Sequence, residues 1–373
     1  MTDLHTSPER RFSFGLPPSP GPDPTRDSAP LLIEPWDFVH GLAEIGAWGV
    51  AIHDDELFPP GATPQERHSV LGKFQAALDN TGVAVSMFAT DLSRHPVFAG
   101  GAFTAPDGDV RRCALQKSLR AVELGAELGA PIHVLNAAHE GIAATAAGTP
   151  TEALDRYREA INFLCGRVRD QDYPITFALA PGAGEPTGNA VLPTIGHALA
   201  FIEMLDHPDM VGLLPTATLE SSQSTYRGVA QAIWSGRLAA IDLNVTQGSA
   251  GLKDMFFLVK ILEESGYLGP RHFGPRPYRG EYGGDVWDFA AGWMRTYSAL
   301  AAKVRRFADD PDIQAAVAEA GVRELSESAV GRYSTAEAQQ LAGRNFDLDA
   351  LVENGHQHDR LDRLITDLLL GLR

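Results

Sequence analysis

The stretch GVAIHDDE, residues Gly49–Glu56, joins a short apolar run to a cluster of polar side chains. The run Gly49–Ile52 has the length and the β-branched content of a buried strand, and the polar residues follow where that strand ends. Similar runs recur along the chain between longer amphipathic stretches. This alternation is typical of a parallel sheet covered by helices, so the stretch predicts one unit of a repeated β/α architecture.

Eight runs of this kind alternate with amphipathic stretches, which predicts an α/β fold, a closed (β/α)₈ TIM barrel. The expected strands are Phe12–Leu16, Gly49–Ile52, Val83–Phe88, Ile132–Leu135, Ile175–Leu179, Val211–Leu214, Ala239–Leu243 and Arg271–Phe273. The expected helices are Pro35–Ala47, Pro64–Thr81, Asp109–Leu128, Thr151–Asp170, Thr194–Leu205, Tyr226–Ser235, Lys253–Gly266 and Asp285–Ala308. Several of them begin with Pro, Thr or Asp, which suit a helix N-terminus.

The strand pattern stops near residue 310, so we expect a TIM-barrel domain over residues 1–309 and a helical C-terminal extension over residues 310–373. The extension is too polar at Ser326–Gln340 to form a core of its own. We expect it to contact another subunit in a dimer or tetramer. Between the first strand and the first helix, Pro17–Pro30 is so rich in proline that it predicts an extended or irregular loop.

Composition excludes several classes of function. The chain has 373 residues, 44% of them hydrophobic, and a formal net charge of −17, which disfavours binding to nucleic acid and to anionic membranes. Its apolar stretches, such as Met255–Leu262, are too short to span a bilayer, and Met1–Arg10 lacks the apolar core of a secretory signal. We therefore expect a cytoplasmic protein whose partner is a small molecule. Cys113 and Cys165 lack the spacing of a zinc site.

Active sites of TIM barrels lie at the C-terminal ends of the strands, so the residues there are the candidates. We predict acid–base roles for His53 and Asp242. We predict that the substrate is bound by Pro17, Thr90, Asn136, Thr216 and Asn244.

His53 is followed by carboxylates that can fix its tautomer and raise its basicity, which makes it a candidate general base. The alternative is that His53 only ends the strand and that Asp54 or Asp55 caps the next turn. Asp242 ends a buried run, so its carboxylate either points into the barrel mouth or forms a structural hydrogen bond. The residues alone leave both choices open.

A site for Mg²⁺ or Mn²⁺ needs several oxygen ligands that converge from different strands. The fifth, sixth and eighth strands are instead followed by Ala180, Thr216 and Gly274. We therefore predict no metal site and no cofactor. The scattered histidines are interpreted as packing residues, namely His95, His133, His139, His197 and His272.

The chain resembles the bacterial xylose isomerases of the short, actinobacterial type from about Phe12 to its C-terminal helix. The stretches that carry the resemblance include Phe14–Leu16, His53–Asp55, His95–Phe98, Asp109–Arg112, Gly196–Glu203, Ile241–Asn244 and Gly269–Phe273. The resemblance implies a TIM barrel, an oligomer, and a reaction in which two divalent metals and a lysine promote a hydride shift in an open-chain aldose.

The same resemblance implies that most of the metal site is absent. The positions of a ligand glutamate, the lysine and the bridging glutamate correspond to Ala180, Gly182 and Thr216, and that of a ligand histidine to Leu219. Asp242 matches one ligand aspartate, whereas another is replaced by Gly274 and the loop with two more is shortened to Val245–Ser249.

The resemblance also implies a changed sugar pocket. The aromatic positions of that pocket correspond to Pro17, Asn136, Ser93 and Thr25, which predicts a larger cavity. The ring-opening histidine of the family is kept as His53, and the aspartate that orients it corresponds to Glu56.

Three functions follow as hypotheses. The first is a metal-independent acid–base enzyme that catalyses proton transfer, dehydration or cyclisation on a substrate larger than a pentose, for example in secondary metabolism. The second is a non-catalytic protein that keeps the scaffold for binding or assembly. The third is a residual sugar isomerase with a rebuilt metal site.

Overall fold

The computed structural model describes residues 10–17, 33–58, 61–93, 95–137, 140–141, 149–182, 190–216, 225–243, 251–274, 286–319, 332–349 and 358–373. Of the proline-rich segment, only Pro17 belongs to these ranges, and Asn244 lies outside them. Within them, no helix is long and apolar enough to cross a membrane.

Eight parallel strands form one sheet in the order β6-β5-β4-β3-β2-β1-β8-β7. Their bounds are β1 Phe12–Gly15, β2 Gly49–His53, β3 Ala84–Ala89, β4 Ile132–Asn136, β5 Thr176–Ala180, β6 Val211–Leu213, β7 Ile241–Asp242 and β8 Arg271–Phe273. The two end strands are joined by the isolated parallel bridges Leu213↔Leu238 and Thr216↔Asp242, so the sheet curls round on itself. The α/β barrel predicted from the alternation is confirmed.

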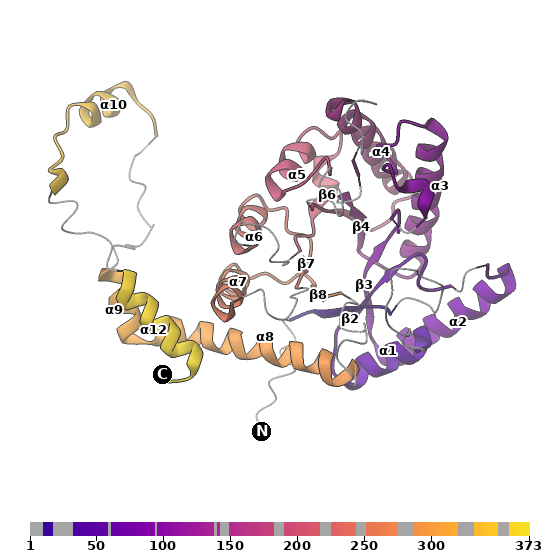
Figure 1. The fold of residues 1–373 in the computed structure, drawn as a ribbon, viewed down its shortest axis with the longest axis horizontal. Coiled ribbons are helices and arrows are strands. Elements are labelled where there is room, and N and C mark those ends of the chain that lie inside the picture. The colour runs from indigo at the N-terminus through magenta and orange to yellow at the C-terminus, as the bar shows by residue number, and fades with distance from the viewer. Residues whose placement is uncertain are drawn as a thin grey trace. The chain divides into compact units, whose positions relative to one another are not determined.

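Helices α1 to α7 follow the strands along the chain and lie around the outside of the sheet (Figure 1). Their bounds are α1 Pro35–Glu44, α2 Pro64–Thr81, α3 Gly108–Glu127, α4 Pro150–Asp170, α5 Ile195–Ile202, α6 Thr225–Trp234 and α7 Leu252–Glu264, and α8 extends over Val286–Asp309. Thr63 and Thr149 form capping boxes with the glutamates three positions on, which fixes the starts of α2 and α4. α1 ends before Gly46. The φ angle of Gly46 is 76°, a left-handed conformation that a right-handed helix cannot contain.

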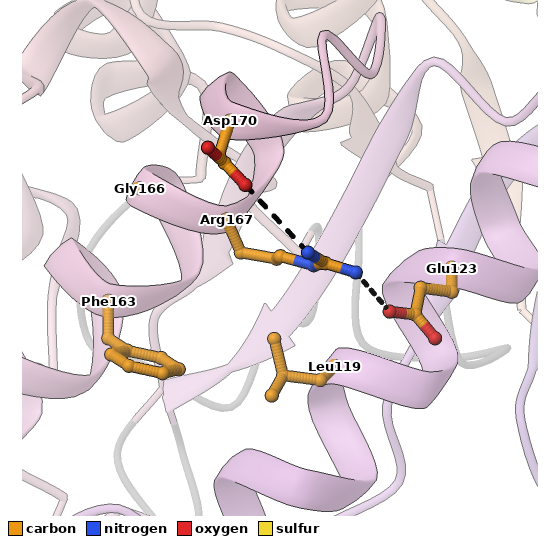
Figure 2. Close-up of a pocket in the computed structure, with 6 residues that line it drawn as sticks. All are labelled: Leu119, Glu123, Phe163, Gly166, Arg167 and Asp170. Atoms are coloured by element: carbon orange, nitrogen blue, oxygen red, sulfur yellow. Dashed lines mark hydrogen bonds and ion pairs between the residues drawn. The ribbon is translucent and has the colours of Figure 1, made fainter.

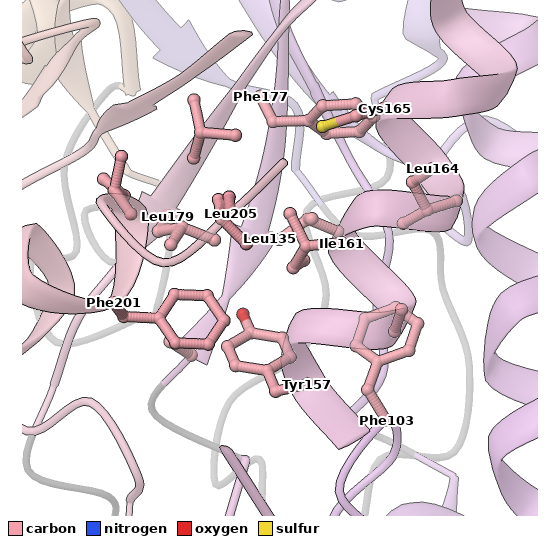
Figure 3. Packing of buried hydrophobic residues seen from close by; sticks show 14 of the residues in the cluster. Phe103, Leu135, Tyr157, Ile161, Leu164, Cys165, Phe177, Leu179, Phe201 and Leu205 are labelled. Atoms are coloured by element: carbon pink, nitrogen blue, oxygen red, sulfur yellow. The ribbon is translucent and has the colours of Figure 1, made fainter. Parts of the chain in front are cut away.

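Helices α3 and α4 cover β4 and β5 and meet at the protein surface over a cavity of about 520 Å³ (Figure 2). Its lining comprises Leu119, Glu123, Phe163, Gly166, Arg167 and Asp170. Beneath these helices lies a large apolar core, in which the Tyr157 ring stacks on Phe201 and Phe103 (Figure 3). Burying these rings between sheet and helices is the main source of stability for this layer.

A second and smaller apolar cluster faces the inside of the barrel. Its members are Ala51, Met87, Ala89, Ile132, Val134, Ala178, Leu214 and Ala240, which come from strands β2 to β7 or directly adjoin them. Since successive side chains of a strand point to opposite faces, these residues define which positions face inward.

The loops that follow β3 and β4 are tied together by one buried carboxylate. The side chain of Glu140 accepts hydrogen bonds from the backbone amides of Ala102, Phe103 and Thr104 at 3.0 to 3.1 Å, and from the Thr104 hydroxyl at 2.8 Å. Burial raises the pKa of Glu140 above its ordinary value, and these hydrogen bonds act in the opposite direction. Glu140 therefore replaces the water that the loop amides would otherwise bind.

The chain divides into two compact units, Met1–Ser298 and Ala299–Arg373. In the second unit, α9 (Pro311–Glu319) packs against α12 (His358–Leu370) through buried residues such as Ile313 and Leu368. Residues 332–349, which include α10 (Thr335–Ala342), are all exposed. This exposed arm carries large apolar side chains, namely Tyr333, Leu341, Phe346 and Leu348.

Candidate active site

The parallel strands place their C-terminal ends at one mouth of the barrel. His53, Asn136, Ala180 and Asp242 are the last residues of β2, β4, β5 and β7. Each of them follows a member of the inward-facing cluster by two residues, and Thr216 likewise follows Leu214 by two residues. The alternation of side chains therefore places all five on the inner side of the barrel at its mouth.

His53 is half-buried at the end of β2, where Glu56 holds its backbone. The His53 amide donates to Glu56 Oε2 at 2.9 Å, and Glu56 itself is only 1% exposed. The ring atom Nδ1 of His53 has no hydrogen-bond partner among the described residues. Glu56 thus fixes the strand end through the main chain, and the orientation of the ring by Glu56 that the resemblance implied stays a prediction.

An ionic cluster next to His53 joins β2 to β3 and α3. Asp54 Oδ1 accepts from the Asp91 amide at 2.8 Å, while Lys117 Nζ lies 3.3 Å from Asp54 and 2.7 Å from Asp55. Burial raises the pKa of Asp54 from 3.8 to about 6, although the charge of Lys117 opposes this rise. Burial acts to lower the pKa of Lys117, but the charges of both carboxylates raise it overall.

Asp242 is half-buried between the neighbouring strands. Its amide donates to the carbonyl of Pro215 at 2.9 Å, and the next amide, of Leu243, donates to the carbonyl of His272 at 2.7 Å. In the sheet register Asp242 pairs with Thr216 on one side and with His272 on the other. These main-chain contacts hold the Asp242 carboxyl group at the barrel mouth.

The other predicted substrate-binding residues have different surroundings. Pro17 is buried just after β1, and Asn136 is exposed at the end of β4. The hydroxyl of Thr90 lies 2.9 Å from Nε2 of the buried His133, whose ring packs against Phe177 of the outer core. Thr90 therefore faces the helices, and its predicted contact with a substrate remains a prediction.

His272 is an inward-facing residue that the sequence interpretation treated only as packing. It is 9% exposed, and its Nδ1 atom has no hydrogen-bond partner among the described residues. The alternation of side chains along β8 is the signal that could have indicated this orientation. Arg271 and Phe273 contact α8, so His272 between them points to the opposite, inner face.

Among the described residues, the donors at the mouth do not fit the pair of divalent metals that the resemblance implied. Strands β5 and β8 are followed or ended by Ala180 and Gly274, and Thr216 offers a single hydroxyl near β6. Across the described ranges, no three His, Cys, Asp or Glu side chains gather closely enough to hold a metal ion. We therefore derive no step through a metal.

The cavity between α3 and α4 is separate from this mouth. Its residues come from the later turns of both helices, which run back towards the N-terminal ends of the strands. Arg167 of α4 forms an ion pair with Glu123 of α3 at 2.8 Å and lies 3.9 Å from Asp170 of its own helix (Figure 2). These ion pairs account for its polar wall without a ligand.

The comparisons with known proteins agree with this architecture. Residues 39–297 match the model of the xylose isomerase-like TIM barrel family, and the chain belongs to this family. It is 41% identical to a xylose isomerase of Thermus thermophilus over 98% of both chains.

Solved structures of similar fold include sugar epimerases. An L-ribulose 3-epimerase has a TM-score of 0.57 at 14% identity, with 80% of this chain and 97% of that chain covered. A 3-keto-D-glucoside 4-epimerase of E. coli has a TM-score of 0.55 at 16% identity, with 77% and 99% covered. At these identities the likeness concerns the fold alone.

Proposed function

We propose that this protein is a metal-independent acid–base enzyme in which His53 and Asp242 move protons on a hydroxylated carbonyl compound. The observation that carries the proposal is the composition of the mouth: β2 and β7 end in His53 and Asp242, whereas β5 ends in Ala180 and β8 is followed by Gly274. The mouth thus has two groups that can transfer protons, while two positions that hold metal ligands in the resembled family are Ala180 and Gly274 here.

The reaction class follows from the chemistry of these groups. An imidazole can act as a general base or acid, and a carboxyl group at the same mouth of the barrel can complete an acid–base pair. Such a pair removes a proton from the carbon next to a carbonyl and gives an enediol. Return of a proton to the former carbonyl carbon isomerises the substrate, and return to the opposite face of the original carbon epimerises it. The net result is an isomerisation or epimerisation, with no change in oxidation state overall.

The substrate class is inferred from the relatives. The curated relative, 41% identical to this chain, is a xylose isomerase. With Pro17 and Asn136 at positions that are aromatic in the resembled family, we propose a hydroxylated carbonyl substrate larger than a pentose.

Solvent deuterium exchange tests this function. The protein is incubated in D₂O with EDTA and a panel of aldoses and ketoses of five to seven carbons, and the loss of C–H signals beside the carbonyl is followed by NMR. We expect exchange in at least one sugar, and His53→Asn should slow it at least 100-fold, since general acid–base catalysis contributes about 10² to 10⁴. His68→Asn, on the exposed side of α2, is the matched control.

Each other result selects a different function. Exchange only after addition of Mg²⁺, Mn²⁺ or Co²⁺ would indicate a rebuilt metal site and contradict the proposal. Binding of a sugar without exchange in any condition would indicate a non-catalytic binding protein.

The exposed arm, residues 332–349, is proposed to contact a second copy of this chain. An 18-residue segment whose side chains are all exposed cannot gain stability from its own packing, and its apolar side chains are suited to burial in an interface.

A further inference from the structure

His272 lies on β8 between β1 and β7. Its register partners are Ser13 and Asp242. Arg271 Nε is 2.8 Å from Tyr297 Oη, and the Phe273 ring stacks on Trp293 at 5.9 Å, so both neighbours of His272 in the chain point at α8. Because side chains alternate along a strand, the His272 imidazole points into the barrel.

The imidazole is a buried polar group with an unsatisfied atom. Nδ1 of His272 has no hydrogen-bond partner among the described residues, and the side chain is 9% exposed. The hydroxyl of its neighbour Ser13 is already engaged with the hydroxyl of Ser86. An unsatisfied buried polar atom of this kind is destabilising, and a hydrogen bond to a ligand oxygen would remove that cost.

His272 and His53 both face the inside of the barrel, as the alternation of side chains along β8 and β2 indicates. Burial, together with the charge of His53, lowers the pKa of His272 from 6.5 to about 3. His272 is therefore neutral at physiological pH, and a neutral imidazole can donate one hydrogen bond. The inward-facing cluster of the barrel consists of small or apolar residues, such as Ala51, Ala178 and Ala240.

We propose that His272 is a second ligand-contacting imidazole, which donates a hydrogen bond from Nδ1 to a hydroxyl or carbonyl oxygen of the substrate while His53 transfers the proton. This inference rests on the proposed function, because it assigns the oxygen-binding group of the same site. In that role the neutral His272 imidazole polarises the substrate carbonyl through a hydrogen bond from inside the barrel. It stays neutral throughout the reaction.

Histidine signals of the wild-type protein test the contact directly. The protein is labelled with ¹³C at histidine Cε1, kept in EDTA and titrated with xylitol, an open-chain polyol that has no carbonyl and cannot react. We expect the signals of His53 and His272 to shift with one common dissociation constant, while the signal of the exposed His68 stays in place. Assignments come from His53→Asn, His272→Gln and His68→Asn.

Two substitutions at His272 separate hydrogen bonding from packing. His272→Phe keeps a ring of similar size without a donor, and we expect it to weaken xylitol binding at least tenfold. His272→Gln restores a donor and should recover part of that loss. Circular dichroism and thermal melting of each variant check that it is folded.

The outcomes distinguish this inference from the proposed function. A shift at His53 alone, with His272→Phe binding xylitol like the wild type, would overturn the role of His272 and leave the acid–base function standing. Shifts at both histidines without deuterium exchange in any sugar would support the contact and overturn the catalytic function. If xylitol, D-xylose and D-tagatose all leave both signals unmoved, the contact is overturned.

Discussion

Replacement of Asp54 by Asn tests the ionic cluster beside His53. The Asp54 side chain is 12% exposed, and it accepts from the Asp91 amide while lying 3.3 Å from Lys117. Asn keeps the oxygen that accepts from Asp91 and removes the titratable proton. The substitution therefore isolates the cost of holding a buried negative charge at this position.

The sign and the size of the effect follow from the pKa of Asp54, which is raised from 3.8 to about 6. A raised pKa means that the folded state binds the proton more tightly than the unfolded state. The stability contributed by this group is therefore complete below pH 3.8 and is lost as the pH rises through about 6. A rise of this size corresponds to about 3 kcal/mol.

Urea unfolding of the wild type and of Asp54→Asn between pH 4 and pH 8 measures the effect. We expect the wild type to lose up to about 3 kcal/mol relative to the variant across this range. Asp55→Asn also removes a carboxylate that contacts Lys117, but this side chain is 46% exposed, so its effect should stay within about 1 kcal/mol at every pH. A difference between wild type and Asp54→Asn that does not change with pH would refute the reasoning.

Two further predictions concern Glu140 and the exposed arm. Glu140→Ala removes the acceptor of three backbone amides and a hydroxyl, so we expect thermal or urea unfolding to show a loss of about 3 to 5 kcal/mol. Glu123→Ala, which breaks an exposed ion pair, should cost at most about 1 kcal/mol, and equal losses in both variants would contradict this account. The double substitution Phe346→Asp and Leu348→Asp should lower the oligomeric state measured by sedimentation velocity, and an unchanged sedimentation coefficient would argue against the arm as an interface.

The barrel could be predicted from local pattern because each strand and helix carries its own signal. Apolar runs placed all eight strands within a few residues of their observed bounds. The errors lie at the ends. β7 is limited to Ile241–Asp242, shorter than the expected Ala239–Leu243, although the Leu243 amide still donates to His272 of β8 and the Ala239 amide donates to Leu213 of β6.

The site could be predicted only where strand ends decided it. His53 and Asp242 could be placed at strand ends because they end apolar runs, and their acid–base roles stay predictions. The contact of Glu56 with a backbone amide, and of Thr90 with His133, depends on distances between loops and strands that no pattern contains. His272 was missed because a histidine inside an apolar run looks the same whether it packs or faces a cavity.

The carboxylate of Glu140 has a consequence for loop dynamics. The carboxylate accepts hydrogen bonds from the amides of residues 102 to 104 and from the Thr104 hydroxyl. The backbone carbonyl of Glu140 accepts a hydrogen bond from the Val191 amide at 2.8 Å. Opening either loop would leave a buried charge without donors, so the loops after β3 and β4 should open together. Hydrogen exchange at Ala102, Phe103 and Thr104 would then be as slow as in the strands, and a ligand that orders one loop would order the other as well.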